Sequence, residues 1–125
     1  MPDKPSADKK LALRTTTMPA DTNPSGDIFG GWILARMDMA GSSTAVKKAG
    51  GRVATVAIDS MEFLRPVFVG DEISCYTEIM KIGKTSITIR VETWRRARDQ
   101  EDMEKVTAGI FIYVAIDRDR TPRVI

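Results

Sequence analysis

The stretch "DIFGGWILARMDMAG", from Asp27 to Gly41, predicts a long helix with a broad apolar face. Apolar or small residues recur along it at the intervals of one helix face, namely Ile33, Met37, Ala40 and Thr44. Lys47 and Lys48 fall in the last turn, where the helix dipole favours cations, and the glycines of "AGG" at 49–51 end the pattern. The sequence therefore predicts a helix from about Ile28 to Ala49.

Most of the remaining chain has the pattern of strands, because the hydrophobic period changes to two after Arg52. Gly83–Lys84 has the composition of a tight hairpin turn. The run from Val53 to Leu64 is apolar on nearly both sides, which is typical of a central strand covered by another layer. The strand candidates cover residues 11–17, 53–64, 72–82, 85–94 and 106–117.

The order of these elements, a strand, a loop, the helix and four hairpin-connected strands, is typical of an α+β fold. The helix is apolar around much of its circumference, so we expect one long central helix wrapped by a curved antiparallel sheet. A single layer of this kind leaves a sheet edge and a helix flank uncovered. We therefore expect dimerisation through the sheet.

The chain of 125 residues has the length of one domain, and 42% of its residues are hydrophobic, enough for a core. No repeat or second domain is evident. We expect a polar, flexible N-terminal arm over residues 1–10, a folded domain over 11–117 and a polar C-terminal tail over 118–125.

Composition excludes several classes of protein. The net charge of +2, from 19 basic and 17 acidic residues, argues against a nucleic-acid binder. The chain contains no histidine, which excludes Ser-His and Cys-His nucleophile pairs and zinc sites built on imidazole. Acid–base chemistry would therefore fall to a carboxylate, a lysine, a tyrosine or a backbone group.

The single cysteine, Cys75, allows no intrachain disulfide and suits a reducing compartment. It stands on an alternating apolar face, so we expect a buried structural thiol. The N-terminal sequence has no apolar signal-peptide core, and no uncharged run is long enough to span a membrane. These features favour a soluble cytoplasmic protein.

Asp38 is the residue of the predicted helix that most needs an explanation. Between Gly30 and Val46 only Arg36 and Asp38 are charged, and they lie about 200° apart around the helix axis. Asp38 shares its side with apolar or small residues, namely Leu34, Gly41, Ser42 and Ala45. An inward carboxylate costs free energy unless something pairs with it or uses it. The ordinary alternative is a solvated aspartate.

Gly30 and Gly31 stand where the loop enters the helix. Free N–H groups of a first helical turn favour a developing negative oxygen, so an acyl carbonyl placed there would find an oxyanion hole. Asp38, about two turns further along the same helix, could polarise a water molecule or attack directly, and Asn23 could orient that water. The arrangement fits acyl transfer to water without histidine. A plain turn at the glycines and at Asn23 is the alternative.

The block "NPSGDIFGGW" (23–32), followed by Met37–Asp38 and the strands of 52–94, resembles the hotdog-fold acyl-CoA thioesterases of the YciA type. The resemblance runs from about Leu11 to Asp117. It implies a hotdog fold and an enzyme that hydrolyses short- to medium- or long-chain acyl-CoA to free fatty acid and CoA. It also implies Asp38 as general base or nucleophile, a thioester carbonyl polarised by the N–H at Gly31, and a water-positioning Asn23 supplied by the other subunit.

The resemblance further implies a homodimer, commonly assembled as a trimer of dimers (a hexamer). Coenzyme A enters as part of the substrate, so no metal or other cofactor is expected, and neither a nucleic acid nor a membrane is an expected partner. One alternative within the same fold is hydration or dehydration of acyl thioesters, which normally relies on a catalytic histidine that this chain lacks. The other alternative is a non-catalytic acyl-CoA-binding or regulatory module. The residues expected to contact the acyl group or CoA are Gly30, Thr55, Arg52, Lys81, Gly83, Lys84, Thr85 and Ser86. For the hairpin positions, a solvated turn with ordinary lysines is an equal alternative.

Overall fold

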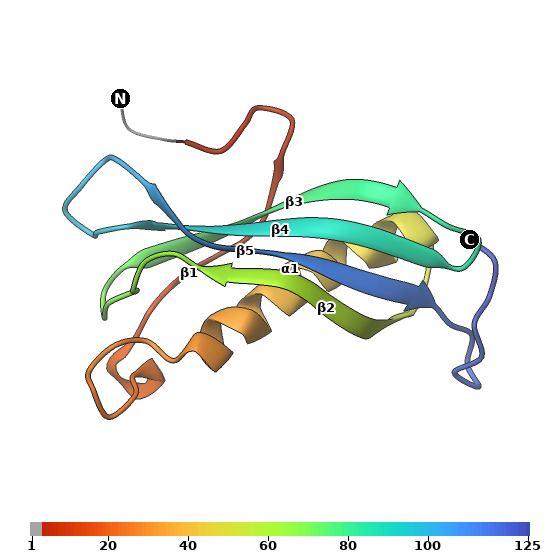
Figure 1. Cartoon of the computed structure of the whole chain (residues 1–125), viewed down its shortest axis with the longest axis horizontal. Helices are drawn as coiled ribbons and strands as arrows, with labels where there is room; N and C mark the ends of the chain where they lie inside the picture. Colours follow the sequence, from red (N-terminus) through yellow and green to blue (C-terminus); the bar gives the residue numbers. More distant parts are fainter. Residues whose placement is uncertain (1–3) are drawn as a thin grey trace.

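The computed structural model describes residues 4–125 and contains one long helix packed on one antiparallel sheet of five strands (Figure 1). The sheet order is β1-β3-β4-β5-β2, with α1 lying along one face. This confirms the expected α+β architecture. The elements are β1 (Lys10–Thr16), the short 3-10 helix η1 (Pro19–Asp21), α1 (Gly30–Ala49), β2 (Val53–Phe63), β3 (Glu72–Ile82), β4 (Ser86–Arg96) and β5 (Glu104–Ala115).

Helix α1 begins two residues later than predicted and ends where predicted. Gly50 follows it in the left-handed conformation, with φ of 70°, and donates its N–H to the Val46 carbonyl at 2.9 Å. That conformation strains residues with a Cβ, which explains glycine at this end. The helix buries the face that periodicity predicted, with Ile33, Met37 and Ala40 fully or almost fully covered.

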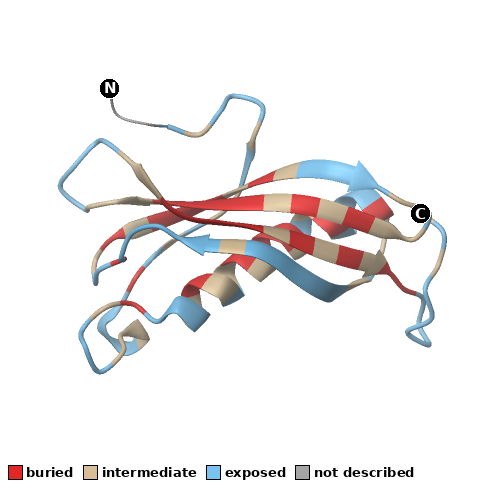
Figure 2. Ribbon diagram, in the orientation of Figure 1, coloured by how far each residue is buried: buried red, intermediate tan, exposed pale blue. Residues whose placement is uncertain are grey.

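The core lies between α1 and the middle strands of the sheet, where buried residues follow β4 and β5 in alternation (Figure 2). Burial of large apolar side chains of this kind is the main favourable term in folding. The largest of these apolar side chains are Tyr113, Phe111, Met37, Ile73, Ile87 and Ile89.

Strand β2 is at the edge of the sheet, so the prediction of a central, covered strand is wrong. It pairs only with β5, and its ribbon is mostly exposed (Figure 2). Val56 is 55% exposed and Ile58 is 41% exposed. Val53 and Met61 pack against the core, but the apolar side chains between them are largely uncovered within one chain. An uncovered apolar edge is a pairing surface for another strand.

The C-terminal segment folds back onto the end of the sheet and helix. Arg123 donates from Nη2 to the Ala49 carbonyl at 2.8 Å, and the Ile125 N–H donates to the Lys84 carbonyl at 3.0 Å.

Of the predicted N-terminal arm, residues 1–3 lie outside the described residues, and Lys9 pairs with the buried Glu92 at 3.4 Å. Within residues 4–125, no helix combines the length and the apolarity that crossing a membrane requires.

Candidate active site

Asp38 lies half-buried on α1, where the helix crosses the adjacent strands β2 and β5. Thr55, on β2, donates its hydroxyl to Asp38 Oδ1 at 2.8 Å. The Tyr113 hydroxyl, on β5, shares its one proton between the same Oδ1, 3.0 Å away, and the Asp38 backbone carbonyl, 3.1 Å away. No hydrogen bond from residues 4–125 reaches Oδ2. One carboxylate oxygen is thus held and the other is left open.

Tyr113 and Gly41 are the two residues at Asp38 that sequence reasoning missed. A Cβ built on Gly41 would overlap the Tyr113 hydroxyl and lie 3.0 Å from Cζ of its ring. Burial, and then the charge of Asp38, raise the pKa of Tyr113 above its usual value, so the phenol keeps its proton. In the sequence, the contact could have been predicted from a tyrosine that stands in an apolar strand, because a buried phenol needs a hydrogen-bond partner.

The start of α1 presents free N–H groups. The first hydrogen bonds are donated by Trp32 at 3.1 Å and Ile33 at 3.2 Å, both to the Phe29 carbonyl. The N–H groups of Gly30 and Gly31 precede them and have no acceptor within the helix. Apart from its chain neighbours and the nearby helix backbone, no atom of residues 4–125 lies within 4 Å of a Cβ built on Gly31, whereas one on Gly30 would be 3.6 Å from the Phe63 ring. The first turn is therefore open at Gly31.

Asp38 and this first turn are not in contact within one chain. Asp38 lies seven positions after Gly31 along the helix, which corresponds to roughly 10 Å of rise. Thr55, predicted to border the acyl site, does contact Asp38. Arg36 lies apart from the carboxylate, with its guanidinium 5.0 Å from the centre of the Trp32 ring.

The side chain of Asn23 forms hydrogen bonds within its own loop. Its Oδ1 accepts hydrogen bonds from the N–H of Ser25 at 2.9 Å and of Asp27 at 3.1 Å. This is the side-chain turn that asparagine commonly forms. No hydrogen bond from its NH₂ group is found in the described part of the chain, and none joins it to Asp38. Its amide donors therefore remain available.

Most of the residues predicted to contact the acyl group or CoA lie at the opposite end of the molecule from Gly31, namely Arg52, Lys81, Gly83, Lys84, Thr85 and Ser86. Ile116 donates its N–H to the Arg52 carbonyl at 3.0 Å, and Ala115 donates to the Thr85 carbonyl at 2.9 Å, which brings these segments together. The hairpin bearing Gly83 to Ser86 lies beside the C-terminus in Figure 1, and both Lys81 and Lys84 are exposed. Helix α1 has 20 residues, so about 30 Å of helix lies between its two ends.

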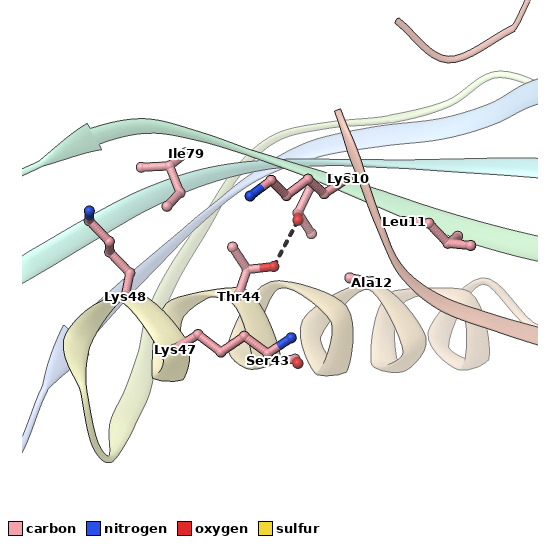
Figure 3. Close-up of a pocket in the computed structure, with 9 residues that line it drawn as sticks. Lys10, Leu11, Ala12, Ser43, Thr44, Lys47, Lys48 and Ile79 are labelled. Carbon is pink, nitrogen blue, oxygen red and sulfur yellow. Dashed lines mark hydrogen bonds between the residues drawn. The ribbon is translucent and has the colours of Figure 1, made fainter. Parts of the chain in front are cut away.

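A cavity of about 310 Å³ lies on the other flank of α1, toward β1 and β3 (Figure 3). Lys10, Lys47 and Lys48 surround it, and none of the predicted site residues lines it. Because β1 and β2 are opposite edges of the sheet, this cavity is separate from Asp38. Lys47 and Lys48 are explained by the helix dipole, which favours cations in the last turn.

Cys75 is buried, as expected, and its thiol lies 3.4 Å from the Thr93 hydroxyl. Burial raises the pKa of the Cys75 thiol to about 11, which makes it a poor nucleophile. Nowhere in residues 4–125 do three or more cysteine or acidic side chains gather in a way that could hold a metal ion.

The chain is similar to known proteins over almost its full length. The family model of the thioesterase superfamily matches residues 25–101. The chain is 50% identical over 117 residues to the acyl-CoA thioester hydrolase YciA of Salmonella typhimurium, covering 91% of this chain and 88% of the relative. It is 46% identical over 118 residues to YciA of Escherichia coli K12, covering 92% and 89%.

Solved structures agree with these sequence matches. The hexameric thioesterase y2039 from Yersinia pestis has a TM-score of 0.90 at 46% identity, covering 93% of this chain and 94% of that one. HI0827, a hexameric broad-specificity acyl-coenzyme A thioesterase, has a TM-score of 0.89 at 44% identity, covering 97% and 84%. An aspartate-to-alanine variant of HI0827 has a TM-score of 0.90 at 44% identity, covering 93% and 86%.

Proposed function

The chain belongs to the thioesterase superfamily, and from this premise we propose that it hydrolyses acyl-CoA thioesters to a carboxylic acid and CoA, with Asp38 as the reactive group. The observation that carries the proposal is the Asp38 carboxylate, which two hydroxyls hold by Oδ1 while Oδ2 stays open. In a chain without histidine, a carboxylate so placed is a suitable general base or nucleophile.

Hydrolysis can follow two routes that use the same carboxylate. As a general base, Asp38 takes a proton from water while the water oxygen attacks the thioester carbon. The resulting oxyanion accepts a hydrogen bond from the Gly31 N–H. Its collapse breaks the C–S bond, and the departing thiolate takes the proton back from Asp38. As a nucleophile, Asp38 instead forms an acyl anhydride, which water hydrolyses after the thiolate leaves.

A homodimer through β2 would complete this site. When β2 pairs with β2 of a second copy about a two-fold axis, the two strands run antiparallel. The first turn of α1 in one protomer then points toward the CoA-binding end of the other protomer. We assign to one site the Asp38 of one protomer and the Gly31 and Asn23 of its partner. The roughly 10 Å between Gly31 and Asp38 within one helix supports this assignment over a site on one helix.

CoA phosphates would then be bound by cations at the hairpin end of the protomer that supplies Asp38. Arg52, Lys81 and Lys84 are the cations there, and the hairpin offers the backbone of Gly83 and the hydroxyls of Thr85 and Ser86. Gly30 and Thr55 would border the acyl group. The reaction needs no metal or redox cofactor, because CoA arrives with the substrate. We expect a trimer of such dimers in the cytoplasm.

The wild-type protein is expected to release CoA from butyryl-CoA and lauroyl-CoA, with kcat/KM for the better substrate of about 10⁴ M⁻¹s⁻¹ or more. A thiol reagent measures this release, and the buried Cys75 does not compete with CoA for the reagent. Binding of acyl-CoA with no release of CoA would instead establish the non-catalytic module.

Placing charges on the β2 edge is expected to weaken the dimer. Val56→Lys together with Ile58→Lys puts like charges opposite each other across the two-fold axis, which opposes association. Light scattering should then show a mass falling toward the 13.8 kDa protomer, with activity lost in parallel. Leu11→Lys is the matched control, because Leu11 is 45% exposed on the opposite edge strand. A fully active monomer would contradict the shared site.

A further inference from the structure

The hydrogen bonds at Asp38 divide its carboxylate into two unlike oxygens. Oδ1 accepts from Thr55 at 2.8 Å and from Tyr113 at 3.0 Å, while no donor within residues 4–125 reaches Oδ2. When one oxygen of a carboxylate is held by hydrogen bonds, the direction of the other oxygen is also fixed. Reactions of bound groups depend steeply on such alignment.

Tyr113 is well suited to hold Asp38, because its side chain is fixed at both ends. Its ring is fully buried in the core and stacks beside Phe111, with 6.4 Å between ring centres. Its hydroxyl also donates toward the Asp38 backbone carbonyl at 3.1 Å. The phenol therefore links the Asp38 side chain both to the Asp38 backbone and to strand β5.

Gly41 makes this contact possible. It lies three residues after Asp38 on the buried side of α1. A Cβ at this position would occupy the space of the Tyr113 hydroxyl and approach its ring to 3.0 Å and 3.2 Å. The ring belongs to the packed core and has little freedom to give way. Any larger residue at 41 would therefore force the phenol away from Asp38.

We infer that Tyr113 is a positioning residue that fixes the Asp38 carboxylate by Oδ1 so that Oδ2 faces the substrate, and that Gly41 provides the space for it. The role assigned to Tyr113 is to hold Asp38, which it contacts at Oδ1. The inference rests on the proposed function, since it assigns Asp38 the reactive role.

Tyr113→Phe tests the inference with the least change in volume. The kcat for butyryl-CoA is expected to fall about 10- to 100-fold, because the carboxylate loses one of two anchors. KM should stay within about twofold, because no substrate contact is lost. Tyr76→Phe is the matched control: it removes the chain's other phenol, whose contact is to Arg14 at 3.5 Å, and should leave kcat unchanged.

Gly41→Ala should lower kcat at least as much as Tyr113→Phe. In the Tyr113→Phe background the same alanine should cost less kcat than it does in the wild type, because the hydroxyl nearest to its Cβ is already gone. Additive losses from the two substitutions would contradict the link between Gly41 and Tyr113. So would a Tyr113→Phe enzyme with wild-type kcat.

A measurement without turnover separates this inference from the proposed function. In urea unfolding, Asp38→Ala and Tyr113→Phe should be non-additive, because each substitution removes the contact between the two side chains. A wild-type protein that hydrolyses no acyl-CoA would overturn the proposed function while the coupling persists. A wild-type enzyme that is active, with a Tyr113→Phe variant equally active, would overturn only the positioning role.

Discussion

Asp38→Asn is expected to lower kcat for butyryl-CoA hydrolysis by about 10³-fold or more, within the usual range for loss of a general base or nucleophile. The amide has nearly the same shape as the carboxylate, and its oxygen can still accept from Thr55 and Tyr113. It cannot take a proton from water, and it is a poor nucleophile toward a thioester. The measurement is CoA release at saturating substrate, alongside circular dichroism to verify the fold.

Asp59→Asn is the matched control for that result. Asp59 is an exposed acid on the same β2 strand as Thr55. Within residues 4–125, its carboxylate accepts one hydrogen bond, a local one from the Ser60 N–H at 2.9 Å. The control should retain wild-type kcat. If Asp38→Asn also kept near-normal kcat, Asp38 would be neither base nor nucleophile, although the family of the chain would be unaffected.

The elements of the fold were predictable because they depend on local periodicity. The helix ending at Ala49 and the hairpin at Gly83–Lys84 follow from spacing and turn residues alone. The place of β2 at the sheet edge was not predictable in the same way. Strand order depends on which strands pair across the chain. An edge strand that pairs with a second copy, as we propose for β2, would have the same apolar pattern as a central strand.

Within the site, the sequence indicated Asp38 through its apolar neighbours on the helix but gave no sign of what holds it. The contact from Tyr113 spans 75 positions in the chain, so no local pattern encodes it. In the sequence, Gly41 looks like any small residue on a helix, and only its contact with the Tyr113 phenol explains why it is glycine. Asn23 and Gly31 remain apart from Asp38 in a single chain, so the roles proposed for them require a second protomer.

Mixing two inactive variants provides the strongest test of that assembly. One variant is Asp38→Ala and the other is Asn23→Asp, which keeps the oxygen that Ser25 and Asp27 donate to but removes the NH₂ donors. Each variant alone is expected to be nearly inactive. Refolded together, the mixture should recover about a quarter of wild-type activity, because half of randomly paired dimers are mixed and each of these has one intact site.

The recovery follows only if Asp38 and Asn23 of one site come from different chains. In a mixed dimer, one site then receives Asp38 from the Asn23→Asp chain and Asn23 from the Asp38→Ala chain, while the other site receives both substitutions. If both residues served from the same chain, every site in the mixture would carry a substitution and activity would stay at the level of the parents. Mixing Asp38→Ala with Asp38→Asn controls for refolding, because no arrangement of those chains restores the carboxylate.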